Sequence, residues 1–227
     1  MKVAIRLLQR FLYTVVLLWV AFMTVALFVN RNSTDMTIRQ KILNTVYPLI
    51  MWAQKKTATK LSSSVTATPV SFYTLTAESN DGVMLNFSDF KGKKVLLVNT
   101  ASDCGYTAQY AELQQLQEQF PDNLVVLGFP ANDFKEQEKG SDADIAVFCK
   151  RNFGVTFPLA KKSVVVKGSL QHPVYRWLTD KAQNGWNSKA PSWNFSKYLV
   201  DESGRLVHYF DPGVSPLSKD VTDAVRQ

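Results

Sequence analysis

The fold is decided by residues 94–129, where two apolar runs flank an amphipathic stretch: Lys94-Val-Leu-Leu-Val-Asn99 and Leu124-Val-Val-Leu-Gly-Phe129. Continuous apolar runs of this length are typical of parallel strands that are covered on both faces. The segment between them, Thr107–Phe120, repeats apolar side chains at helical spacing. The stretch therefore predicts a β-α-β unit, which almost always crosses over with a right hand.

Further strands and helices are predicted on both sides of this unit. The turn signal Asn80-Asp81-Gly82 indicates a hairpin, and the capping box that begins at Ser141, with Asp in place of the usual Glu, indicates a helix start. The expected elements are a hairpin of Phe72–Thr76 and Val83–Phe87, a helix from Ser141 to Asn152, a short strand Ser163–Lys167, a helix His172–Lys181, a hairpin of Tyr198–Asp201 and Arg205–Phe210, and a last helix from Ser215. This order predicts an α/β three-layer sandwich of the thioredoxin type with an N-terminal β-hairpin.

The chain has only two cysteines, Cys104 and Cys149. Cys104 lies in the loop after the first buried strand, just before a predicted helix. The free N–H groups and partial positive charge of a helix start are expected to lower the pKa of a thiol placed there. In an exported domain, a structural disulfide is the alternative interpretation.

Other cysteine chemistries fit this sequence less well. A cysteine protease requires a histidine base, but His172 precedes a proline at a helix start and His208 lies within a strand. A Cys-x-x-Cys pair is absent because position 107 is Thr. A single activated thiol with a distant second thiol fits peroxide chemistry, in which a sulfenic acid condenses to a disulfide.

Three ordered motifs resemble the glutathione peroxidase family, over a region from about Phe72 to the C-terminus. They are Val98-Asn-Thr-Ala-Ser-Asp-Cys-Gly-Tyr-Thr107, Gly128-Phe-Pro-Ala-Asn-Asp-Phe-Lys-Glu-Gln-Glu138 and Trp193-Asn-Phe-Ser-Lys-Tyr-Leu-Val200. The resemblance implies that Cys104 is the peroxidatic thiol and that Gln137, Trp193 and Asn194 complete a catalytic tetrad. Side-chain amides and an indole N–H can donate to a thiolate and to a departing peroxide oxygen. Taken alone, Trp193 would be interpreted as a residue of the hydrophobic core and Gln137 as an ordinary loop residue.

Cys149 resembles the resolving cysteine of the thioredoxin-dependent members of this family. The resemblance implies that its helix partly unwinds so that the two sulfurs can meet. The alternative is a buried free cysteine that packs as a small apolar residue. The family also implies no metal and no prosthetic cofactor, with a thioredoxin-like protein or glutathione as the thiol co-substrate.

Several departures from the family pattern affect these expectations. Cys rather than selenocysteine at position 104 implies a slower peroxidase, and Ala131 replaces a common third cysteine. Asp133 stands where Gln is usual, and with Asp103 it is expected to oppose the lowering of the Cys104 pKa. Lys181–Ser192 is short where the tetrameric glutathione-specific members carry an insertion. This implies a monomer or weak dimer and a protein reductant.

The N-terminus is expected to anchor the chain in a membrane. Phe11–Val29 contains no charged residue and would span about 28 Å as a helix. Basic residues precede it, so the positive-inside rule sends the rest of the chain to the periplasm or the ER lumen. The glycosylation sequon at Asn194 favours the periplasm, because a glycan on a tetrad residue would be a hazard. A cleaved signal peptide is the alternative.

Residues 36–55 predict a second helix, which Pro48 should kink or interrupt, lying either along lipid headgroups or as a plain stalk. Thr57–Pro69 is expected to be a flexible linker by its composition. The sequence therefore divides into an anchor at 1–30, a juxtamembrane segment at 31–70 and a peroxidase-like domain at 71–227.

The net charge of +7 belongs to the N-terminal part of the chain. Residues 1–70 hold nine Lys and Arg against one acidic residue, a net of +8, which leaves −1 for the rest. A near-neutral domain argues against nucleic acid as a partner. The sequence thus predicts a membrane-anchored thiol peroxidase; a peroxide-driven redox sensor or disulfide donor, and a non-enzymatic binding domain of the same fold, are the alternatives.

Overall fold

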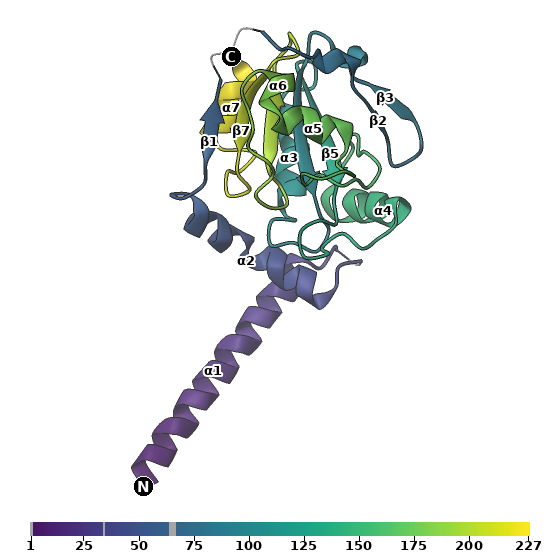
Figure 1. Cartoon of the computed structure of the whole chain (residues 1–227). Helices are drawn as coiled ribbons and strands as arrows, with labels where there is room; N and C mark the ends of the chain where they lie inside the picture. Colours follow the sequence, from purple (N-terminus) through teal and green to yellow (C-terminus); the bar gives the residue numbers. More distant parts are fainter. Residues whose placement is uncertain (1, 34, 64–66) are drawn as a thin grey trace.

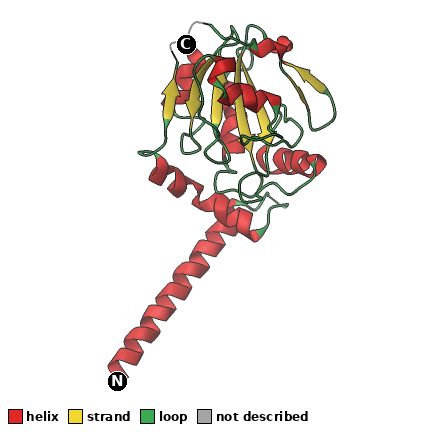
Figure 2. Cartoon of the chain, viewed as in Figure 1, coloured by secondary structure: helices red, strands yellow, loops and turns green. Residues whose placement is uncertain are grey.

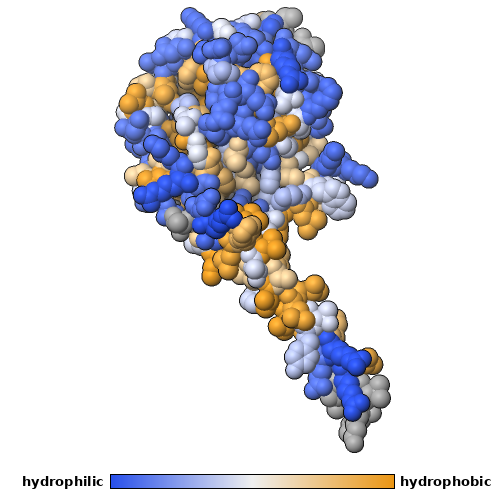
Figure 3. Space-filling model, turned by 180° about the vertical axis from the view of Figure 1, so that it is seen from behind, coloured by the Kyte–Doolittle hydropathy of each residue, from blue (hydrophilic) through white to orange (hydrophobic). Residues whose placement is uncertain are grey.

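The computed structural model describes residues 2–33, 35–63 and 67–227. A long helix, α1 (Lys2–Val29), projects from a domain that contains the remaining elements (Figure 1). Within α1, the 21 residues Gln9–Val29 form a stretch long and apolar enough to cross a bilayer, although a signal sequence passes the same test. Figure 3 shows apolar side chains along this rod and at its junction with the domain.

The central sheet has the strand order β1-β7-β6-β4-β5. Its strands are β1 (Lys60–Ser62), β4 (Lys94–Thr100), β5 (Leu124–Pro130), β6 (Lys197–Val200) and β7 (Leu206–Phe210). β4 and β5 pair in parallel, and the other pairs are antiparallel. The predicted parallel β-α-β unit and the C-terminal hairpin are therefore confirmed.

Helices cover both faces of the sheet, which gives three layers (Figure 2). Leu96 and Val98 of β4 face a core formed with α3 (Gln109–Gln119), α4 (Asp142–Phe153) and α7 (Lys219–Arg226). Val95 and Leu97 face the opposite core, formed with α5 (Pro173–Thr179). The alternation follows from the two-residue side-chain period of a strand. The expected thioredoxin-like sandwich is thus confirmed.

A separate two-stranded sheet, β2 (Thr76–Glu78) and β3 (Met84–Asn86), precedes the central sheet. The hairpin is confirmed, but its predicted ends are wrong. Phe72–Thr74 forms the 3-10 helix η1, and Phe87–Phe90 forms the 3-10 helix η2. The rings of Phe72 and Phe87 pack 4.9 Å apart in the core, so burial against each other, rather than strand pairing, places them.

Three other local predictions are corrected. Ser163–Lys167 is not a strand, because the Val165 N–H bonds to the Asp133 side chain, at 2.7 Å, rather than to a neighbouring strand. The last helix begins at Lys219 rather than Ser215. Lys60–Ser62, within the expected flexible linker, pairs with β7 as an edge strand.

The second helix, α2 (Ile38–Gln54), lies between α1 and the domain (Figure 1). A capping box fixes its start: the Thr37 N–H donates to Gln40 Oε1 at 2.8 Å, and the Gln40 N–H donates to Thr37 Oγ1 at 3.2 Å. The helix continues through Pro48 rather than ending there. Short helix α6 (Lys181–Asn184) completes the set of helices.

Candidate active site

Cys104 lies in a tight loop between the end of β4 and the start of α3. The loop is held by Thr107, whose Oγ1 accepts the Cys104 N–H at 3.0 Å and donates to the Ala101 carbonyl at 2.9 Å. The Tyr106 N–H points at the Cys104 sulfur, 3.5 Å away. The position of the sulfur is therefore fixed by backbone and hydroxyl groups from within its own loop.

The expectation of a lowered Cys104 pKa is wrong for this structure. Only 1% of Cys104 is exposed, and burial raises the pKa of its thiol. Hydrogen bonds from the Tyr106 N–H and from the Trp193 and Asn194 side chains act in the opposite direction but are weaker. The expected opposition from Asp103 and Asp133 plays no part, since the first pairs with Arg39 and the second accepts the Val165 N–H.

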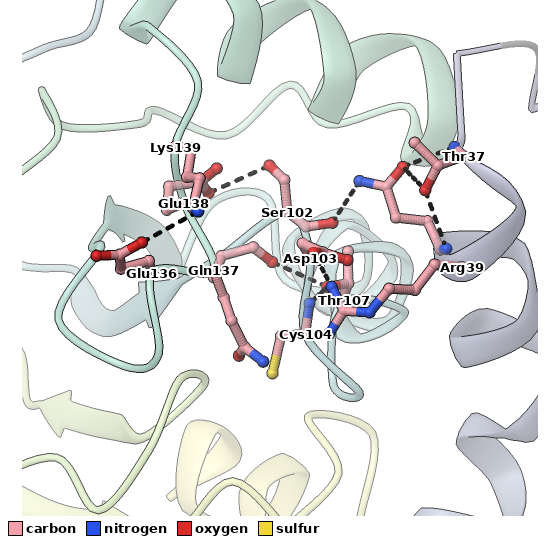
Figure 4. A network of polar contacts seen from close by, with 12 residues as sticks. Thr37, Arg39, Ser102, Asp103, Cys104, Thr107, Glu136, Gln137, Glu138 and Lys139 are labelled. Carbon is pink, nitrogen blue, oxygen red and sulfur yellow. Dashed lines mark hydrogen bonds and ion pairs between the residues drawn. The ribbon is translucent and has the colours of Figure 1, made fainter.

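The structure brings Gln137, Trp193 and Asn194 around Cys104, from two loops that are distant in sequence. Asn194 donates to Gln137 Oε1 at 3.0 Å, and both Trp193 and Asn194 reach the Cys104 sulfur. The side chain of Gln137 points towards that sulfur in Figure 4. Its backbone carbonyl also accepts the Asp103 N–H at 3.1 Å. The four side chains therefore form one cluster of a thiol and three uncharged hydrogen-bonding groups.

Both loops have strained backbone next to these groups. Lys135 and Glu136, directly before Gln137, have φ of 51°, and Phe195, directly after Asn194, has φ of 68°. A left-handed conformation costs a non-glycine residue about 1–2 kcal/mol, and such strain concentrates at functional sites. The surrounding contacts must hold these loops in place.

Asn99, at the end of β4, supplies these contacts for the loop Trp193–Ser196. Its Nδ2 donates to the Trp193 carbonyl at 3.0 Å, and its Oδ1 accepts the Ser196 N–H at 3.1 Å. Its own carbonyl accepts the Phe195 N–H at 2.6 Å. Asn99 is fully buried, so these bonds are shielded from water and strongly favour one loop conformation.

Cys149 lies on α4 in the same apolar core as Cys104, and both thiols are free. The side chain is fully buried, and burial raises the pKa of its thiol to about 12, with a smaller contribution from the Glu138 carboxylate. Tyr110 lies beside it and packs edge-on against Phe195, with ring centroids 5.3 Å apart. Cys149 is therefore a protonated, enclosed thiol in this conformation.

Glu138 lies behind the Cys104 loop and is the most perturbed carboxyl group near the site. Its side chain accepts a hydrogen bond from Ser102 Oγ at 3.2 Å (Figure 4), and its exposed fraction is 1%. Burial raises its pKa from 4.5 to about 7, although the Ser102 bonds and the charge of Lys162 lower it in part. The sequence pattern gave no signal for this burial.

Helix α2 packs directly on the loop of Cys104. Arg39 forms an ion pair with Asp103, and Gln40 Nε2 donates to the Ser102 carbonyl at 3.0 Å. A Cβ placed on Gly105 would lie 3.2 Å from Ile50 Cδ1. Beyond this contact is a hollow of about 320 Å³, lined by Gln54, Thr57, Ala58, Tyr106, Ser192, Trp193, Asp211, Pro212 and Gly213. Helix α2 thus covers the Cys104 loop, and its last residue, Gln54, contributes to the lining of this hollow.

A buried thiol surrounded by uncharged donors on a thioredoxin-like sandwich defines a thiol enzyme of that fold. Comparisons with known proteins give the family. Residues 72–179 match the glutathione peroxidase family model. The chain is 44% identical over 151 residues to the glutathione peroxidase-like peroxiredoxin 2 of Saccharomyces cerevisiae, covering 66% of this chain and 93% of the relative. It is 45% identical over 146 residues to the glutathione peroxidase homolog BsaA of Staphylococcus aureus, covering 64% and 91% respectively.

A solved structure agrees with these sequence relatives. The crystal structure of Trgpx in apo form has a TM-score of 0.53 at 31% identity, covering 73% of this chain and 98% of that one. The chain belongs to the glutathione peroxidase family, and it is a peroxidase, an oxidoreductase. Peroxidases of this family use no prosthetic cofactor and take a thiol reductant as co-substrate. Among the residues that the structure describes, no three metal-ligating side chains gather as a metal site.

Sequence reasoning missed two structural partners of the site. Asn99 lies within the first motif, but its clamp on the third motif becomes visible only in three dimensions. The contact of α2 with the Cys104 loop had no sequence signal, because a helix of mixed polarity does not identify the surface on which it packs. The structure brings the predicted residues Gln137, Trp193 and Asn194 together at Cys104, whereas Cys149 lies on α4 as a free, buried thiol.

Proposed function

We propose that this protein reduces hydrogen peroxide and organic hydroperoxides through Cys104, with Gln137, Trp193 and Asn194 as the groups that stabilise the reacting atoms. The observation that carries this proposal is the convergence of three uncharged side chains from two strained loops on one buried sulfur. Because none of the three titrates near neutral pH, each can donate a hydrogen bond in every step.

In the first step, the Cys104 thiolate attacks one peroxide oxygen. The S–O bond forms, the O–O bond breaks, and the departing oxygen takes a proton to leave as an alcohol or water. The sulfur is oxidised to sulfenic acid while the peroxide is reduced. The cluster offsets the raised pKa of the thiol by stabilising the thiolate once peroxide has entered.

In the second step, we propose that the Cys149 thiol attacks the Cys104 sulfenic acid, forms a disulfide and releases water. A disulfide needs Cα atoms about 4.4–6.8 Å apart, and Cys149 is enclosed in α4, so α4 must open locally. A dithiol reductant, which we propose to be a thioredoxin-like protein rather than glutathione, then reduces the disulfide and is itself oxidised.

Intact-mass analysis of the reduced protein after one equivalent of peroxide tests this scheme. The wild type should lose two hydrogen atoms, and Cys149→Ser should instead gain one oxygen atom that a sulfenic-acid reagent captures. Absence of any change at Cys104 would refute the peroxidatic role. If the wild type instead kept the oxygen adduct and formed no disulfide, the resolving role of Cys149 would be refuted, while the peroxidatic role of Cys104 would stand.

We also propose that α1 remains as a membrane anchor and that the domain, as a monomer, lies on the non-cytosolic side, in the periplasm rather than the ER lumen. The length and apolarity of Gln9–Val29 support the anchor. This position would place the enzyme near lipid hydroperoxides. In sealed inside-out vesicles of the inner membrane, the domain should be protected from added protease. Digestion of the domain in intact cells whose outer membrane has not been disrupted would contradict a periplasmic position.

A further inference from the structure

Helix α2 has two faces of different character. Gln40, Tyr47 and Ile50 lie on the face that contacts the domain, where Tyr47 Oη donates to Glu112 Oε1 at 2.7 Å. On the opposite face, Ile38, Leu49 and Trp52 are 63%, 64% and 75% exposed. At about 100° per residue, these three fall within about 60° of one another around the helix. We call them the apolar stripe.

The apolar stripe lies on the side of α2 from which α1 departs. Asn30, at the end of α1, is 1% exposed and donates from Nδ2 to the Lys41 carbonyl at 3.2 Å and to Thr45 Oγ1 at 3.1 Å. Asn44 donates to Asn30 Oδ1 at 2.6 Å. Thr45 belongs to the same side of the helix as the stripe, so this junction fixes the apolar rod and the apolar stripe together.

We infer that α2 is seated in the headgroup region of the bilayer that α1 crosses, with the apolar stripe inserted at the boundary of the acyl chains. This inference rests on the proposed role of α1 as an anchor. An exposed row of large apolar side chains with a tryptophan at one end is typical of interfacial helices. Lys55 and Lys56 follow the stripe and are exposed, where they can meet anionic headgroups.

A lipid surface fits the stripe better than a protein partner because the stripe is continuous with α1. The candidate membrane-spanning stretch ends at Val29, and α2 begins at Ile38, only nine positions further along the chain. If α1 crosses the bilayer, α2 must therefore lie at its surface. The domain contacts occupy the other face of α2, so seating the stripe disrupts none of them.

The consequence is that one helix separates lipid from the peroxidatic loop. An α-helix with its side chains is about 10–12 Å in diameter, and α2 touches the Cys104 loop directly through Arg39 and Ile50. The structure therefore presents the active-site face of the domain to the membrane, rather than holding it at the end of a long stalk.

Quenching of tryptophan fluorescence by brominated lipids tests the inference on the full-length protein. The protein is reconstituted into vesicles of three parts phosphatidylcholine and one part phosphatidylglycerol, with bromine placed either near the headgroup or near the chain end. Comparing Trp19→Phe with Trp19→Phe/Trp52→Phe isolates the emission of Trp52. Comparing Trp52→Phe with the same double variant isolates Trp19. Both side chains are largely exposed, so neither substitution removes core packing.

The expected result is that Trp52 is quenched more strongly by bromine near the headgroup, while Trp19 is quenched most strongly by bromine deeper in the chains. Leu170, 80% exposed on the domain, gives a matched control: a Leu170→Trp reporter in the double variant should not be quenched. Quenching of Trp19 without quenching of Trp52 would overturn the seating of α2 and leave the anchor intact. Absence of quenching at both would overturn the anchor and, with it, this inference.

Discussion

Glu138→Gln is expected to stabilise the protein above neutral pH and to have little effect in acid. Glu138 and Gln have nearly the same shape, and the amide oxygen can still accept the hydrogen bond from Ser102. The substitution therefore removes a buried negative charge while retaining the packing. It tests whether the region behind the peroxidatic loop is as poorly solvated as the geometry indicates.

The magnitude follows from the pKa. Burial raises the pKa of Glu138 from 4.5 to about 7, and one pKa unit corresponds to about 1.4 kcal/mol. The folded state therefore binds this proton more tightly than the unfolded state. The resulting stabilisation is fully present below pH 4.5, declines as pH rises and is lost above about pH 7, a total change of about 3 kcal/mol.

Thermal unfolding of the full-length protein in detergent, at about pH 5 and about pH 8, measures this difference. Removing about 2.5 kcal/mol of pH dependence should raise the Tm of Glu138→Gln at the higher pH by about 5–10 °C more than at the lower pH. Glu136→Gln is the matched control. Glu136 is two residues away on the same loop, and 72% of its side chain is exposed.

Equal Tm shifts at the two pH values would refute the reasoning, because the carboxyl would then have the same pKa in the folded and unfolded states. A Glu138→Gln protein less stable than the wild type at the higher pH would show that the ionised carboxylate makes a net favourable contact. A comparable shift in Glu136→Gln would assign the effect to the charge of the loop as a whole rather than to burial.

Three further predictions concern the site. Asn99→Ala removes two side-chain hydrogen bonds to Trp193–Ser196. It should lower the free energy of unfolding in urea by about 2 kcal/mol and slow sulfenic acid formation in stopped-flow assays. An unchanged rate of reaction with peroxide would show that Asn99 does not hold this loop in its reactive conformation. Arg39→Ala breaks the ion pair between α2 and the peroxidatic loop and should speed alkylation of Cys104 by iodoacetamide several-fold. The control Lys161→Ala removes an exposed ion pair elsewhere on the domain and should leave the alkylation rate of Cys104 unchanged. Equal alkylation rates in the two variants would show that α2 does not restrict the loop. Because burial raises the pKa of the Cys104 thiol, its thiolate fraction and alkylation rate should still increase with pH beyond the range where an ordinary cysteine is fully ionised; a plateau at neutral pH would contradict this.

The elements that the sequence predicted well are those whose signal is local. The apolar runs of β4 and β5 specify strands covered on both faces, and the Ser141 capping box specifies the start of α4, where the Asp144 N–H donates to Ser141 Oγ at 3.2 Å. These signals depend on neighbours a few residues away. The structures that they specify therefore form independently of how the rest of the chain folds.

The errors come from long-range partners. Ser163-Val-Val-Val-Lys167 has the composition of a strand, but its backbone bonds instead to the Asp133 side chain and to the Pro130 carbonyl. Lys60–Ser62 has the composition of a linker, but β7 offers it an unpaired edge. In both cases the available partner, not the propensity, decides the structure.

The site shows the same division. The order of the motifs indicated which side chains meet, because the family pattern contains the geometry of the loops. The direction of the Cys104 pKa was wrong, since it depends on how completely the loop is covered. That cover is provided by α2 and by the loop after Trp193, and neither is close to Cys104 in sequence.

The pairing of β1 with β7 and the contacts of α2 with the peroxidatic loop fix both ends of the segment between the rod and the sheet. Little slack chain remains in which the domain could swing. On a membrane, such a molecule would keep its reactive face at one height, so its reductant would have to arrive within a thin layer above the lipid. A reductant that is itself tethered would meet it at a high effective concentration, whereas the amount of reductant free in bulk solution would matter less.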